Sequence, residues 1–81
     1  MNMRFPTQAE VQRLRDLYPS GTRIELISMD DQYTTLSAGA LGTVDGVDGA
    51  GQIMMTWDSG SSLSLIPGVD SFMIIQDGGI Q

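Results

Sequence analysis

The sequence contains no cysteine, no histidine and no lysine. Without cysteine there is no disulfide, thiolate metal site or thiol nucleophile, and without histidine the commonest general base and zinc ligand are missing. Serine–histidine and cysteine–histidine mechanisms are therefore excluded within one type of chain. No apolar run approaches the ~20 residues of a membrane helix, and the first residues lack the apolar core of a signal peptide. We expect a soluble cytoplasmic protein with no membrane partner and no cofactor.

The charges of the chain are few and unevenly placed. Ten acidic residues and four arginines give a net charge of −6, and from Ile24 to Gln81 the charged residues are all acidic. Binding to duplex nucleic acid needs several cations along the phosphates, so we do not expect it. A small anionic ligand held by a few arginines remains open. The arginines are Arg4, Arg13, Arg15 and Arg23.

Residues 6–18 carry the signature of one amphipathic helix. Thr7 and Glu10 have the spacing of a capping box, in which each side chain binds the other residue's backbone. The segment 19–21, Pro-Ser-Gly, is typical of a helix end. Apolar side chains recur at helical spacing on one face, namely Val11, Leu14, Leu17 and Tyr18.

After Gly21, short apolar runs alternate with clusters of glycine, aspartate and serine, which is typical of small all-β domains. This rhythm predicts a mainly β fold, in which a small barrel over residues 21–75 follows the helix and precedes a tail at 76–81. Gly46 interrupts its strand and indicates a bulge. The five predicted strands are Thr22–Met29, Leu41–Val47, Gln52–Trp57, Ser61–Ile66 and Phe72–Ile75.

The outward-facing positions of these strands are unusually apolar. Ile27, Met54 and Met73 alternate with inward-facing residues, where a solitary barrel is expected to show polar side chains. Either the helix and the tail cover these positions, or they form an interface that makes the protein a homo-oligomer. The sequence leaves both explanations open.

The stretch Asp58–Ser62, DSGSS, is similar to the catalytic loop of aspartic proteases. That chemistry needs two carboxylates that share a proton, which a symmetric dimer can supply as Asp58 from each chain. However, Asp58 falls at the tip of a predicted hairpin, where Gly60 supplies a positive φ. We therefore predict a turn, and dimeric proteolysis is the remote alternative.

Two aromatic residues are candidates for contacts. Trp57 either closes the barrel core or forms an exposed platform for a ligand. Tyr33 lies in the long connection Asp30–Ala40, where functional residues are often found. The loop aspartates lack the spacing of a calcium loop, so we assign no metal ligand.

Three segments resemble a known family: GTRIELISMDD at 21–31, GTVDGVDGAGQI at 42–53 and WDSGSSLSLIPGVDSF at 57–72. They are similar to a small bacterial and phage family catalogued as domain of unknown function number 4314. The resemblance covers residues 21–75 and departs at Gln32, where the family usually has proline. The same pattern is generic to SH3-like barrels, so the fold we expect is an SH3-like five-stranded barrel.

The resemblance implies a non-enzymatic binding module carried by phages or mobile elements. In the first hypothesis it binds a host protein stoichiometrically, in an accessory or anti-defence role. In the alternative it is an oligomeric sponge that sequesters a small anionic nucleotide signal, which requires converging arginines and a stacking aromatic. The predicted ligand-binding residues are Arg23, Arg4, Tyr33, Trp57 and Asp31.

Overall fold

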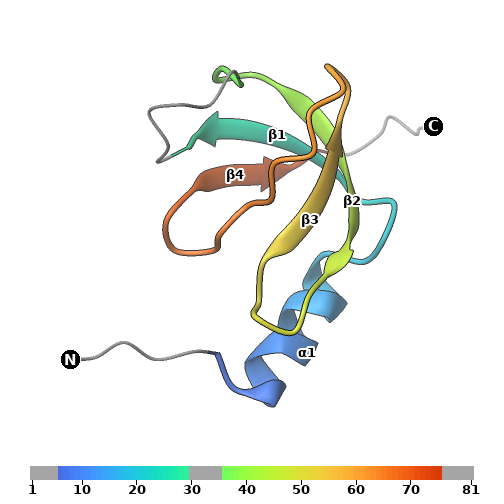
Figure 1. Cartoon of the computed structure of the whole chain (residues 1–81), viewed down its shortest axis with the longest axis vertical. Coiled ribbons are helices and arrows are strands. Elements are labelled where there is room, and N and C mark those ends of the chain that lie inside the picture. The colour runs from blue at the N-terminus through green and yellow to red at the C-terminus, as the bar shows by residue number, and fades with distance from the viewer. Residues whose placement is uncertain (1–5, 30–35, 76–81) are drawn as a thin grey trace.

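A computed structural model describes residues 6–29 and 36–75 of the chain (Figure 1). One helix precedes four strands, which confirms the mainly β prediction. The elements are α1 (Gln8–Leu17), β1 (Arg23–Ser28), β2 (Leu41–Val47), β3 (Ile53–Trp57) and β4 (Ser71–Ile74).

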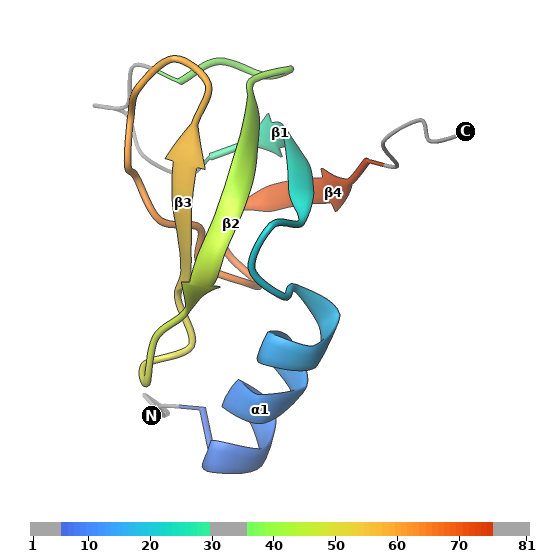
Figure 2. The same cartoon turned by 90° about the vertical axis from the view of Figure 1, so that its right-hand side faces the viewer.

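Helix α1 begins and ends where its capping residues predict. Thr7 Oγ1 accepts a hydrogen bond from the Glu10 N–H at 3.1 Å, and Glu10 Oε1 accepts one from the Thr7 N–H at 2.8 Å. The helix lies beyond the end of the sheet, below β2, and does not cross either sheet face (Figure 2). Val11 is buried there, and Arg15 Nε donates to the Val47 carbonyl at 3.1 Å.

The four strands form one antiparallel sheet in the order β3-β2-β1-β4. Its register shifts twice, between Val44 and Gly46 where β2 meets β3, and between Leu26 and Ser28 where β1 meets β4. Each shift leaves one extra residue on a strand and bends it. The bulge predicted at Gly46 is thereby confirmed.

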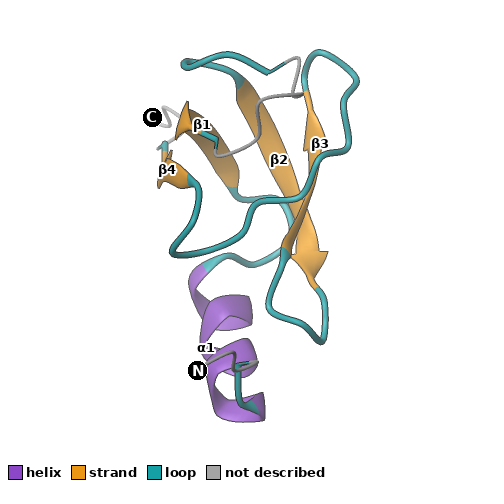
Figure 3. Ribbon diagram, turned by 60° about the vertical axis from the view of Figure 1, so that its left-hand side comes forward, coloured by secondary structure: helices purple, strands orange, loops and turns teal. Residues whose placement is uncertain are grey.

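The core lies on one side of this sheet. The segment 58–70 leaves the end of β3 and crosses that side to reach β4 (Figure 3). Its Leu65 is fully buried against the inward-facing strand residues. Gly42 leaves room for the largest of these residues, because a Cβ at position 42 would lie 2.7 Å from Trp57 Cε3. The side chains at or below 1% exposure are Ile24, Leu26, Val44, Ile53, Met55, Trp57 and Leu65.

The prediction of a fifth strand at Ser61–Ile66 is wrong. The segment keeps hairpin register with β3 at two points: the Trp57 N–H donates to the Ser61 carbonyl at 2.9 Å, and Ile53 and Leu65 form a bridge. Leu63, which would pair with Met55 in that register, binds elsewhere. Its N–H donates to Ser61 Oγ at 3.3 Å and its carbonyl accepts from Trp57 Nε1 at 2.8 Å. These local bonds replace the ladder, so the described sheet has four strands and is not closed.

Candidate functional site: the outer face of the sheet

The outer face is the side of the sheet away from the core. Four of its apolar side chains are well exposed: Ile27 at 50%, Leu41 at 37%, Met54 at 41% and Met73 at 48%. Helix α1 lies at the end of the sheet (Figures 1 and 2), so it does not cover this face. The predicted tail at 76–81 lies outside the described residues.

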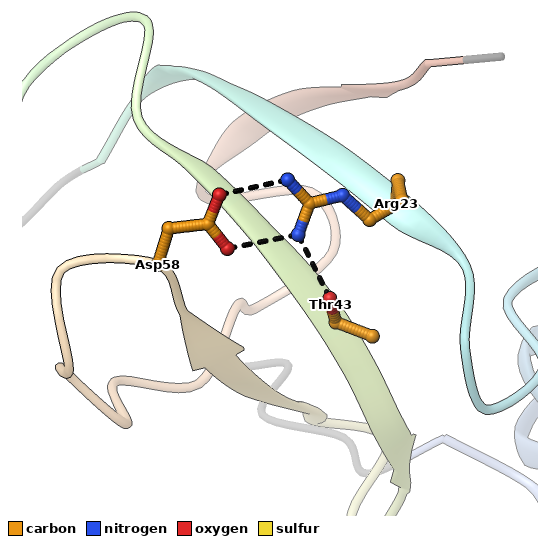
Figure 4. A network of polar contacts seen from close by, with 3 residues as sticks. All are labelled: Arg23, Thr43 and Asp58. Atoms are coloured by element: carbon orange, nitrogen blue, oxygen red, sulfur yellow. Dashed lines mark hydrogen bonds and ion pairs between the residues drawn. The ribbon is translucent and has the colours of Figure 1, made fainter. Parts of the chain in front are cut away.

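A polar network crosses the outer face from β1 to the turn after β3 (Figure 4). Strand pairing places Arg23 opposite Thr43. The Arg23 guanidinium donates to Asp58 Oδ1 and Oδ2, both at 2.8 Å, and to Thr43 Oγ1 at 2.9 Å. The hydrogen bonds from Arg23 lower the pKa of Asp58, desolvation opposes them, and the charge of Arg23 adds to the lowering. The Arg23 guanidinium therefore binds a carboxylate of its own chain.

The same geometry settles the local structure of the DSGSS stretch. The Gly60 N–H donates to the Trp57 carbonyl at 2.8 Å, and Gly60 has a φ of +98°, so 58–60 is the predicted turn. An aspartic dyad requires a second carboxylate and a shared proton. Asp58 instead faces an arginine that favours its ionised form.

Glu25 lies at the middle of the outer face. Strand pairing places it opposite Leu41 on one side and opposite Met73 on the other. It is half-buried, and within the described part of the chain it makes no hydrogen bond or ion pair. Glu25 is thus an unpaired carboxylate between two exposed apolar side chains. Sequence reasoning missed Glu25, because its neighbours depend on the strand register.

The comparisons with known proteins now identify the family. The family model described as "Domain of unknown function (DUF4314)" matches residues 7–75. The chain belongs to this family. Comparison with curated proteins and with solved structures gave no match. The matched region begins at the N-cap of α1 and ends directly after β4, so the DUF4314 unit includes the helix as well as all four described strands.

The structure separates the predicted ligand residues of this DUF4314 domain. Trp57 is 1% exposed and lies in the core, whereas Arg23 lies on the outer face, so the two do not share a pocket. Arg4, Asp31 and Tyr33 lie outside the described residues. Among the described side chains, no group of three or more acidic residues is placed to hold a metal ion. No described helix has the length and apolarity needed to cross a membrane.

A groove of the DUF4314 domain lies between α1 and two turns. It encloses about 550 Å³ and is lined by Leu14 and Leu17 of the helix, by the 50–52 turn and by Ile66 and Pro67. Leu17 and Ile66 are 53% and 43% exposed. Arg13 and Glu10 both line this groove, so its charges balance and indicate no particular ligand.

Proposed function

We propose that this DUF4314 domain is a non-enzymatic module that binds another protein stoichiometrically through the outer face of its sheet. One observation carries the proposal: the row Leu41–Glu25–Met73 combines an unpaired carboxylate with two exposed apolar side chains. Packing explains the residues of a core, but none of these three belongs to the core cluster. A phage origin, an anti-defence role and a cytoplasmic location stay predictions from the sequence.

The charges of the outer face indicate which kind of partner surface would be complementary to it. Glu25, Asp45 and Asp58 all lie on or beside it, and the sequence contains no arginine or lysine after Arg23. Arg23 itself is held by Asp58. A complementary partner therefore presents cationic and apolar side chains together. A second copy docked through the same face would bring like charges together, which disfavours it.

The apolar flanks of Glu25 make a charged contact there more effective. A cation bound to a fully exposed carboxylate gains little, because water screens the pair. When a partner covers Leu41 and Met73, it removes water from around Glu25 and lowers the local dielectric. The apolar contacts and the ion pair then reinforce one another, which favours an arginine-bearing protein surface over a simple counterion.

A binding titration tests this proposal. The probes are two short fluorescent peptides, one with alternating arginine and leucine and one with glutamate in place of arginine, each followed by fluorescence anisotropy. We expect binding of the arginine peptide only, and an affinity about tenfold weaker for Glu25→Gln, equivalent to about 1.4 kcal/mol. Asp16→Asn is the matched control, because it removes the same charge from the exposed helix. Equal binding of both peptides would contradict the proposal. So would an equal loss of affinity for the arginine peptide in Glu25→Gln and Asp16→Asn.

The nucleotide sponge remains an alternative prediction. An anionic ligand at Arg23 has to displace Asp58, and the described residues bring no aromatic ring to that arginine. A nucleotide released when the purified protein is denatured would favour the sponge over the protein-binding function.

We further infer that the described sheet is an incomplete SH3-like barrel, which lacks a complete fifth strand and stays open along the outer edge of β4. The support is the segment 58–70, which follows β3 in antiparallel register and forms the Ile53–Leu65 bridge. It crosses the core side of the sheet before it leads into β4 (Figure 3).

A further inference from the structure

Strand β4 is an open edge of the sheet. One of its sides pairs with β1, where Met73 lies opposite Glu25 and the Ile75 N–H donates to the Arg23 carbonyl at 3.0 Å. Backbone groups of an antiparallel strand point alternately to its two sides. The N–H and carbonyl groups of Phe72 and Ile74 therefore point away from β1, where no described strand pairs with them.

Apart from its length of four residues, this edge lacks the features that usually prevent strand pairing. Proteins protect exposed edges with lysine, proline, inward-pointing charges or a covering segment. Residues 71–75 read Ser-Phe-Met-Ile-Ile and contain neither a charge nor a proline. The opposite edge, β3, is covered by the segment that forms the Ile53–Leu65 bridge. Within the described residues, β4 is thus the unprotected edge.

We propose that β4 pairs antiparallel with β4 of a second copy of the chain, around a two-fold axis at Met73. In this register Phe72 of each copy lies opposite Ile74 of the other, and these are the residues whose backbone groups pair with no described strand. Each Phe72–Ile74 pair exchanges both of its hydrogen bonds, and the two Met73 side chains meet on the axis as a close, non-hydrogen-bonded pair. The same patch serves both copies, as a two-fold dimer requires.

The charges do not oppose a second copy at this edge, in contrast to the acidic outer face. The strand itself is neutral, so no like charges meet along it. The nearest acids on the sheet, the two Glu25 residues, are three strand spacings apart, roughly 14 Å. That separation exceeds the screening length of about 8 Å in physiological salt. The paired sheets form one continuous sheet and place two outer faces side by side, although the dimer does not depend on what that face binds.

Light scattering after size-exclusion chromatography, over a range of loading concentrations, tests the dimer. We expect the wild-type mass to rise from monomer to dimer with concentration. Met73→Lys and Met73→Glu should each remain monomeric, because like charges then meet on the axis. Mixing these two variants should restore the dimer mass, since opposite charges now meet. A monomer at every concentration, or a dimer that persists in either variant alone, would overturn the proposal.

Proline substitutions test the backbone pairing separately. Ile74→Pro removes an N–H that faces the open edge, so the monomer should keep its circular dichroism spectrum while the dimer is lost. Ile75→Pro is the matched control, because it removes the N–H that binds the Arg23 carbonyl and should lower the unfolding midpoint. If Ile74→Pro fails to fold, the Met73 charge pair still decides the outcome. A dimer retained by a folded Ile74→Pro variant would show that β4 is not the interface.

Discussion

The two faces of the sheet differ in how far their apolar side chains are buried. On the core face, the buried side chains of β1, β2 and β3 are all apolar and at most 6% exposed, and no polar or charged residue is buried among the described residues. On the outer face, acids alternate with apolar side chains that are 37 to 50% exposed. Packing accounts for the buried side chains of the first face, because each of them is enclosed. It does not account for the exposed apolar side chains of the second face, and we propose that these side chains serve binding.

The strongest way to test this contrast is to truncate one residue on each face of β3. Trp57→Ala removes a ring enclosed in the core and the hydrogen bond from its Nε1 to the Leu63 carbonyl. We expect a loss of about 3 to 5 kcal/mol in the free energy of unfolding. Met54→Ala, on the outer face, should cost about 0.5 kcal/mol or less. Urea unfolding followed by far-ultraviolet circular dichroism measures both, and comparable losses would remove the distinction between the faces.

A smaller loss of stability is expected for a substitution at Gly42, where the backbone of β2 lies against the ring of Trp57. The Cβ of Gly42→Ala would lie 2.7 Å from Trp57 Cε3 and 3.1 Å from Met55 Cε, so the ring or the strand must shift. Overpacking of this kind costs about 1 to 3 kcal/mol. Gly49→Ala is the control, because an added Cβ there meets no atom within 4 Å. Equal unfolding midpoints for the two variants would show that β2 and Trp57 are loosely packed.

Much of the fold was predictable because its signals are local. The capping box depends on two residues three positions apart, and the turn at 58–60 depends on a glycine that tolerates positive φ. Strand alternation likewise predicted which side of β3 faces inward. Such features need no knowledge of distant partners, which is why Thr7, Glu10 and Gly60 behave as the sequence indicates.

The remaining features depend on contacts between distant segments. Alternation alone predicted a strand at 61–66, but the Trp57 indole binds the Leu63 carbonyl and takes it out of the ladder. Glu25 is a candidate binding residue because Leu41 and Met73 lie on either side of it, and only the strand register shows that they do. Arg23 was predicted as a ligand residue, and its internal partner Asp58 lies 35 positions away. Each case requires the relative placement of strands, which the sequence pattern does not specify.

The smallest predicted effect concerns the outer face alone and depends on pH. Because Arg23 lowers the folded-state pKa of Asp58, their pairing stabilises the fold above the unfolded-state pKa of Asp58. That contribution is lost as the pH falls through the lowered folded-state pKa. Asp58→Asn should therefore lower the unfolding midpoint at neutral pH and make little difference at about pH 2. The effect should be modest and should shrink in high salt, since the Asp58 side chain is 55% exposed.

The control for this last prediction is Thr43→Val, which removes a neutral hydrogen bond to Arg23 and leaves the ion pair with Asp58 in place. Its effect on the unfolding midpoint should be the same at both pH values. If Asp58→Asn were equally destabilising at neutral and acidic pH, the side chain would act through the 58–60 turn and not through its charge. A pH-dependent loss would show that Asp58 stabilises the fold through its ion pair with Arg23.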